Sequence, residues 1–408
     1  MRRMHQARIL KNTKPPDIII TFMLPLLALN AIVTIAASLE LWLFPSIISC
    51  SPQAILHITF ALGIMPLILA AIIYFVPVLT RGSGAAPWLN VTPVLAWFGA
   101  AGILAGFCGQ FDMLVASQVS FIFSIAAVAA ILLWMQRRSR RMLGNPHPCF
   151  DWYLAALVFL GSALLVIPAM AQWPTYWTAL KLYHLHANLL GFVGLTAIGT
   201  LQVLYPTAAG YVDPAASSRL AKDLKFSCAG VLLLAIGAAL ADGPAAGIFV
   251  AKLMALSGAA LYLIAPLRMG NHWRKEIGTR TGCLNGAVPS LVLSCIGLLG
   301  LIFAGIGHML GMLSGRDASL GFIVAFLLPL VSGAATQLLP VWLRPGPQRD
   351  WHAQLRSNLG KLSGLRALLM VCGGFSIALG WPEGLWLGVA GILLFATTAI
   401  AALLSSAA

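Results

Sequence analysis

The chain has 408 residues, of which 60% are hydrophobic and only 9% are charged. A soluble domain carries roughly 25% charged residues, so this composition excludes a soluble enzyme, a disordered protein and a nucleic-acid binder. The net charge of +14 is instead typical of a protein that meets a membrane surface.

Apolar stretches long enough to cross a bilayer, which takes about 20 residues as a helix, recur along the whole chain. We count twelve, which begin near Ile18, Ala54, Trp88, Met113, Tyr153, Leu182, Phe226, Ala246, Val288, Gly321, Leu365 and Leu385. In lipid the backbone must satisfy its own hydrogen bonds. We therefore predict an all-α integral membrane protein with twelve transmembrane helices in one membrane domain, and the lipid bilayer as its first partner.

The basic residues are distributed very unevenly between the two sides that twelve spans define. If the N-terminus is cytoplasmic, 22 of the 25 Lys and Arg residues fall in cytoplasmic segments, and the exceptions are Lys181, Lys252 and Arg316. Positive charge is retained on the cytoplasmic side of membrane proteins. The pattern predicts a multi-pass protein of a bacterial-type inner membrane with both termini in the cytoplasm.

The spans divide into three quartets of similar length, about 1–136, 137–268 and 269–408. In the second span of each quartet a small residue precedes a proline by seven positions: Ala70 and Pro77, Gly199 and Pro206, Gly333 and Pro340. His57 and His186 both lie twenty positions before the proline, where the third quartet has Leu320. We predict three pseudo-repeated four-helix units.

The eight histidines separate by side. His5, His147, His272 and His352 lie in basic segments, where we expect surface positions, whereas His57, His184, His186 and His308 lie at the opposite ends of spans two, six and nine. Ionisable groups inside a membrane bundle are costly, and imidazole is a common ligand of haem iron and copper. The second group predicts a metal or haem site, and interhelical hydrogen bonding is the alternative.

The spacing of His184 and His186 has a geometric consequence. Residues two apart on a helix diverge by roughly 200°, so the two imidazoles serve different compartments. We expect His57 to complete one centre as a second axial ligand, and His308 or Lys252 to neighbour His184 in the other.

Three further residues near these ends are candidates. Met309 and Met312 follow His308, and imidazole with thioether suits Cu(I); simple packing is the alternative for both methionines. Lys252 interrupts span eight and either extends to the interface or takes part in proton relay or propionate binding.

The run from His184 to Phe192, followed by Gly199, Pro206 and Gly210, resembles the H-x-H-x-x-L-x-G-F…G…P…G segment of NnrS-type proteins. Those membrane proteins bind haem and copper and are linked to nitric oxide tolerance. The three quartets also resemble the catalytic subunit of haem-copper oxidases. Ala187 replaces the acidic residue of the NnrS motif, and no adjacent histidine pair is present. The resemblance therefore implies haem, of b type, or copper binding more than oxygen reduction.

These observations favour a haem- or copper-binding membrane protein that acts in respiration or the nitric oxide response, with partner subunits that the sequence does not identify. A transporter of a small solute or metal is the main alternative. Transporters usually have twofold repeats and polar groups near the midplane, whereas the spans of this chain divide into three quartets and its histidines lie near one face. A membrane scaffold with structural histidines is the third reading.

Overall fold

The computed structural model describes residues 18–43, 51–241, 245–276 and 285–407, and within these ranges all regular structure is helical. It confirms the predicted number of spans, because twelve helical segments are long and apolar enough to cross a membrane. They run over Ile19–Leu43, Gln53–Leu79, Pro87–Phe107, Met113–Arg140, Cys149–Gln172, Pro174–Ala208, Ala216–Leu240, Gly247–Lys275, Val288–Met309, Gly315–Leu343, Asp350–Ala378 and Gly384–Ser406. The predicted basic N-terminal segment and His5 lie outside the described residues.

Nine spans each contain one long α-helix. These are α2 (Ile18–Leu43), α5 (Val91–Phe107), α6 (Met113–Arg140), α7 (Cys149–Gln172), α10 (Ala216–Leu240), α11 (Ala245–Glu276), α12 (Val288–Met309), α16 (Ser363–Ala378) and α17 (Gly384–Ala407). Short 3₁₀ turns form the start of two spans, at Pro87–Asn90 and Pro174–Tyr176. A separate helix, α15 (Asp350–Leu359), precedes α16, which is why the eleventh span begins earlier than predicted.

Spans two, six and ten are built differently from the others, because each changes from α-helix to π-helix and back. The segments in order are α3 (Pro52–His57), η1 (Ile58–Ile64) and α4 (Met65–Leu79); α8 (Trp177–His186), η4 (Ala187–Gly194) and α9 (Leu195–Ala208); and α13 (Gly315–Gly321), η6 (Phe322–Leu327) and α14 (Leu328–Leu343). The π-helical turns start within two residues of the matched positions His57, His186 and Leu320. The three spans thus share a construction, while the division into whole quartets stays a prediction.

Carbonyl groups in two of the π-helical segments are bonded by side chains of neighbouring helices. Asn30 of α2 donates its side-chain amide to the carbonyl of Leu62 in η1, at 2.8 Å. Tyr262 of α11 donates its hydroxyl to the carbonyl of Leu190 in η4, at 3.0 Å. A π-helical turn disturbs the regular backbone ladder, so these donors stabilise the turn inside an apolar bundle.

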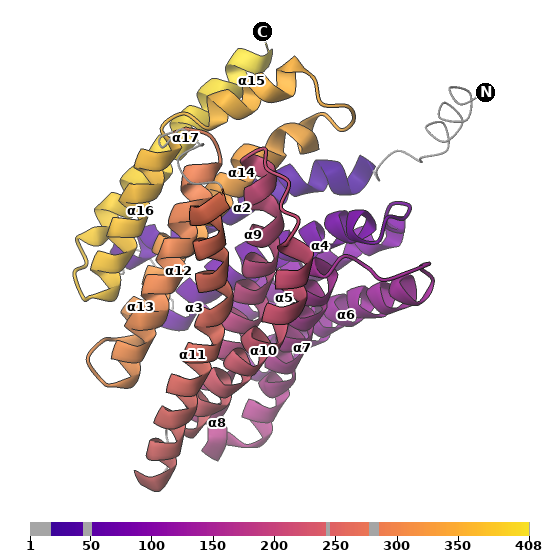
Figure 1. Ribbon diagram of the computed structural model, residues 1–408. Coiled ribbons are helices and arrows are strands. Elements are labelled where there is room, and N and C mark those ends of the chain that lie inside the picture. The colour runs from indigo at the N-terminus through magenta and orange to yellow at the C-terminus, as the bar shows by residue number, and fades with distance from the viewer. Residues whose placement is uncertain (1–17, 44–50, 242–244, 277–284, 408) are drawn as a thin grey trace.

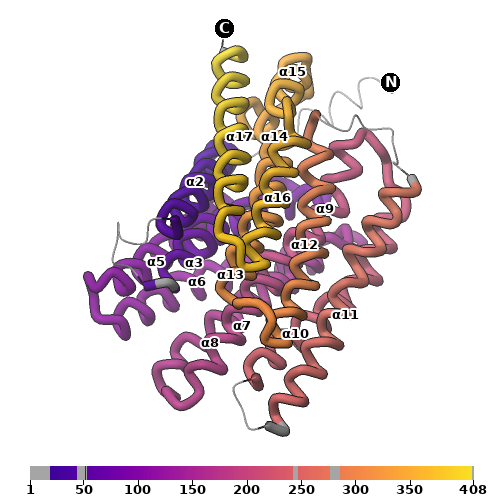
Figure 2. Tube along the Cα trace, turned by 90° about the vertical axis from the view of Figure 1, so that its left-hand side faces the viewer, coloured from indigo at the N-terminus to yellow at the C-terminus, as the bar shows by residue number. Residues whose placement is uncertain are grey.

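Consecutive spans form antiparallel hairpins around the three composite spans. The closest neighbours along the chain are α5 with α6, α10 with α11, and α16 with α17. Spans six and ten are the most buried, with 78% of the residues in their most apolar stretch inside the bundle. Figures 1 and 2 show that α15 and the end of α17 lie at the top of the molecule and α8 lies toward the bottom.

The two ends of the bundle differ in their polar groups. We call the end that carries His57, His184, His186 and His308 the histidine end. The other end holds most of the arginines, and we call it the basic end. It carries the ion pairs that the described residues form. Asp213 contacts Arg219 at 2.7 Å and His272 at 3.1 Å, and Asp223 contacts Arg268 at 2.7 Å.

Candidate functional site: four histidines at one end of the bundle

Four histidines reach the histidine end from three different helices. His57 is the last residue of α3, directly before the π-helical segment η1. His184 and His186 are in the last turn of α8, directly before η4. His308 is in the last turn of α12. The local changes in helix type therefore coincide with two of the predicted ligand positions.

His57 and His184 form the first pair. Their ring centroids are 6.3 Å apart, and their ring planes differ by only 16°. The His57 ring also packs against Phe107 of α5, with ring centroids 4.9 Å apart. The two imidazoles are therefore too far apart for direct ring-on-ring contact, and nearly parallel.

We call His186 and His308 the second pair, and because residues two apart on a helix diverge by roughly 200°, His186 lies on the other flank of α8 from His184. The two imidazoles are close enough to interact electrostatically. Gly315, at the start of α13, lies against the His308 ring, and a Cβ at this glycine would be 2.9 Å from Nε2 of His308. His308 is exposed, whereas the other three imidazoles are half-buried.

All four imidazoles are fixed by the same kind of hydrogen bond. Each donates from Nδ1 to a backbone carbonyl: His57 to Gln53 at 2.8 Å, His184 to Ala163 at 2.8 Å, His186 to Leu182 at 2.8 Å and His308 to Leu313 at 2.9 Å. A carbonyl oxygen accepts only, so the proton is on Nδ1 and the lone pair is on Nε2. None of the four Nε2 atoms has a hydrogen-bond partner among the described residues. A histidine that binds a metal through one ring nitrogen almost always donates a hydrogen bond from the other, as these four do from Nδ1.

The described histidines of the basic end differ in this respect, since each of their Nε2 atoms lies within 3.3 Å of an oxygen atom. Nε2 of His352 bonds the carbonyl of Arg344 at 2.8 Å, and Nε2 of His147 lies 3.3 Å from the hydroxyl of Ser217. Nε2 of His272 contacts Asp213. The surface position expected for His352 is wrong, because α15 packs against α14 and α17 and leaves this side chain only 4% exposed.

The structure corrects the expected neighbours of His184. His57 lies beside it, and His308 instead acts electrostatically on His186. His184 and His186 have different neighbours, as expected for residues two apart on a helix, but the sequence did not show which helix each one meets. Lys252 is exposed on α11 and makes no hydrogen bond or ion pair with a described residue.

The two methionines after His308 are not gathered around it. Met312 is 75% exposed and Met309 is half-buried. Among the described residues, no group of three or more His, Cys, Asp or Glu side chains is arranged to hold a metal ion. The site therefore consists of paired imidazoles.

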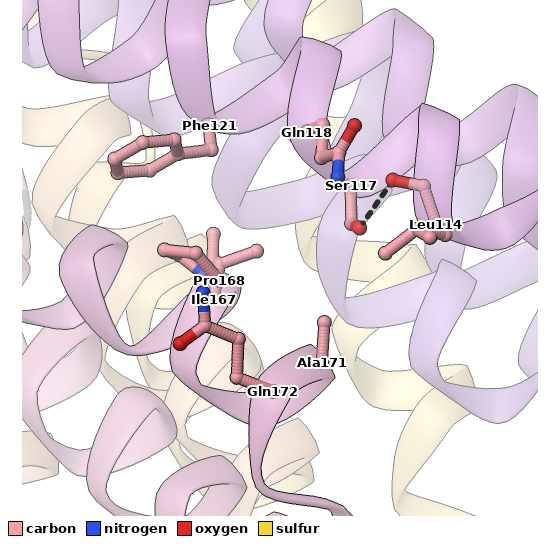
Figure 3. A pocket seen from close by; sticks show the side chains of 8 residues that line it. All are labelled: Leu114, Ser117, Gln118, Phe121, Ile167, Pro168, Ala171 and Gln172. Carbon is pink, nitrogen blue, oxygen red and sulfur yellow. Dashed lines mark hydrogen bonds between the residues drawn. The ribbon is translucent and has the colours of Figure 1, made fainter.

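A cavity of about 280 Å³ lies between α6 and α7 (Figure 3). Apolar side chains such as Phe121 and Ile167 line it together with three polar ones, Ser117, Gln118 and Gln172. Ser117 bonds the carbonyl of Leu114 at 2.8 Å. The wall residue Ile167 is one turn along α7 from Ala163, whose carbonyl orients His184.

Comparison with known proteins adds no relative. No family model matches the chain, and neither a curated protein nor a solved structure matches it. The fold therefore defines the class, a polytopic helical membrane protein with twelve candidate spans.

Sequence reasoning missed the π-helical turns beside the histidines. It also missed the two side chains that bond carbonyls of these turns, Asn30 and Tyr262. A π-helical turn adds little to the spacing of apolar residues, so it leaves no periodic signal. The one hint was the matched distance from His57 and His186 to their prolines.

Proposed function

We propose that this protein binds haem in the membrane, with His57 and His184 as the two axial ligands of one b-type haem. An imidazole nitrogen lies about 2 Å from the metal that it binds, so two imidazoles on opposite sides of one ion have ring centres about 6 Å apart. The 6.3 Å separation of the two ring centroids supports this arrangement. It is the observation that carries the proposal.

The donor set fits haem better than a bare metal ion. A structural metal ion is usually held by four protein ligands, and the described residues offer no group of three or more. Haem supplies four equatorial nitrogens itself and takes only axial ligands from the protein. Two imidazoles with free Nε2 atoms are such a pair.

His186 and His308 form a second centre in this proposal, for haem or copper. Their Nδ1 atoms are anchored in the same way, and each Nε2 lacks a partner among the described residues. Because the two pairs lie on opposite flanks of α8, one centre is expected to survive the loss of the other.

The chain's own residues would orient and shield the groups. The carbonyls of Gln53 and Ala163 hold the first pair in one tautomer, and Phe107 covers the His57 ring. Bound haem would supply one-electron chemistry and a site for a small gas. A role in respiration or nitric oxide defence follows from the NnrS-like segment, and an inner-membrane location with cytoplasmic termini from the basic residues.

An absorption spectrum of the purified full-length protein tests the proposal. We expect a Soret band, sharp α and β bands after reduction, and a pyridine adduct typical of b-type haem. The His57→Ala and His184→Ala variants should lose the same signal, because each removes one axial ligand of one haem.

The matched control is His147→Ala, which removes an imidazole at the basic end and should leave the spectrum unchanged. A featureless spectrum of the protein purified from cells that were supplied with haem would contradict the proposal. The paired histidines would then be structural, and a transporter or scaffold would be the better reading.

A further inference from the structure

Five arginines gather at one corner of the basic end, and we call them the arginine patch. Arg81 follows α4, and the others end α6 or follow it: Arg137, Arg138, Arg140 and Arg141. None of the five is in an ion pair with a described residue. Within the part of the chain that the structure describes, no carboxylate therefore compensates their positive charge through an ion pair.

Arg138 is the ordered centre of this patch. It donates from Nε to the hydroxyl of Thr80 at 2.6 Å and from Nη2 to the carbonyl of Ser83. Its guanidinium carbon lies 5.6 Å from the centre of the Trp134 ring. Gly82 permits this approach, because a Cβ there would lie against Nη2. The guanidinium is thus held in place, and its Nη1 has no partner among the described residues.

The loop after α6 places an apolar side chain beside the arginines. Leu143 is 104% exposed, the most exposed large apolar side chain described. Gly144 follows it with φ of +94°, a left-handed conformation that suits glycine. A fully exposed leucine next to basic residues is typical of a segment that enters the headgroup region of a bilayer.

His147 connects this loop to α4. Its backbone N–H donates to the carbonyl of Leu79 at 3.0 Å. Burial, and then the positive charge of Arg81, lower the pKa of His147 below its ordinary value of 6.5. The imidazole is therefore neutral near pH 7, and the arginines supply the positive charge of this corner.

We propose that the arginine patch binds the phosphate of an anionic phospholipid, with Leu143 against its acyl chains. Arg138 would bind the phosphate through its free Nη1, and Arg81 would approach it from α4. The guanidinium group suits phosphate because it is planar and always charged, and basic pockets at the ends of membrane helices bind anionic headgroups. A zwitterionic lipid would gain less, since its own ammonium group opposes the patch.

The test uses the full-length protein in nanodiscs that contain phosphatidylcholine with or without phosphatidylglycerol, and native mass spectrometry of the lipids that stay bound. We expect phosphatidylglycerol to be retained selectively. Arg81→Gln should weaken this retention about fivefold, because it removes one of the guanidinium groups that contact the bound headgroup. Arg274→Gln, which removes an exposed arginine from α11 at the same end, is the matched control.

Leu143→Ser provides a second variant that removes no hydrogen bond of the fold and should also reduce retention. Equal retention of both lipids, or an effect of Arg274→Gln as large as that of Arg81→Gln, would overturn the proposal. Inorganic phosphate added to the nanodiscs that contain phosphatidylglycerol distinguishes the source of the ligand. If inorganic phosphate at millimolar concentration displaces the retained phosphatidylglycerol, the patch binds free phosphate instead.

Discussion

The orientation of each imidazole at the histidine end is set by one backbone carbonyl. Two of these carbonyls lie four residues earlier on the same helix, as for His57 with Gln53 and His186 with Leu182. His184 instead bonds Ala163 on α7, so its orientation depends on the packing of α7 against α8. The chemistry of these residues was readable from the sequence, but the partner of His184 was not.

At the same scale, Asp213 illustrates how the basic end responds to acid. Burial opposes its ionisation, but the hydrogen bond and charge of Arg219, the N–H of Ala215 and the nearby His272 outweigh burial and lower the pKa of Asp213 below its ordinary value of 3.8. A carboxyl whose folded-state pKa is lowered stabilises the fold fully above its ordinary value, and this contribution disappears as the pH falls through the folded-state pKa.

We therefore predict that Asp213→Asn lowers the free energy of unfolding by about 2 kcal/mol at pH 7, because it leaves Arg219 without its carboxylate partner. Thermal unfolding of the detergent-solubilised protein between pH 3 and pH 7 measures the effect. The difference from the unchanged protein should shrink below pH 4. A constant difference over this range, or an equal effect from the exposed control Asp350→Asn, would contradict the prediction.

At the scale of elements, close approach of helices fixes the three composite spans. Gly297 of α12 faces the backbone of η6, and a Cβ at this position would overlap the carbonyl oxygen of Ala325. Backbone atoms cannot move aside as a flexible side chain can. The glycine is therefore required for α12 to pack against the π-helical turn.

We predict that Gly297→Ala destabilises the protein by about 1–3 kcal/mol, the usual effect of overpacking a tight core. Gly305→Ala on the same helix is the control, because a Cβ at Gly305 would meet nothing within 4 Å. Thermal unfolding of both variants gives the comparison. Equal melting temperatures for the two would show that η6 does not need this contact.

The elements also show where sequence reasoning succeeds and where it stops. Span positions follow from apolar length, so the starts near Met113 and Val288 coincide with helix starts. The extra helix α15 was missed because its amphipathic sequence, with His352 and Leu355 buried and Asp350 exposed, lacks the apolar length of a span. The pairing of histidines was missed because it depends on how helices pack.

For the whole molecule, the distribution of charge predicts the orientation in the membrane. Of the 25 Lys and Arg residues, 22 fall in the segments that we predict to be cytoplasmic. Lys181 and Arg316 are at the histidine end, where they lie over the indole rings of Trp177 and Trp42. Such an asymmetry orients membrane proteins with the basic end in the cytoplasm.

We predict that reporter fusions after Arg141 and at Ala408 report a cytoplasmic position. Fusions near Trp177 and Arg316 should report the opposite side. Activity of a cytoplasmic reporter at Trp177 would contradict the orientation, and a mixed result along the chain would contradict the number of spans.

The central claim is that His57 and His184 bind the same haem, and electron paramagnetic resonance of the oxidised full-length protein tests it most directly. Axial imidazoles with nearly parallel planes give a rhombic low-spin signal, and the two ring planes differ by 16°. We predict such a signal in the unchanged protein and in the His186→Ala variant, and its loss in both His57→Ala and His184→Ala. If this rhombic signal survives with unchanged g values in either of the last two variants, or is absent from the haem-supplied protein, the claim is contradicted.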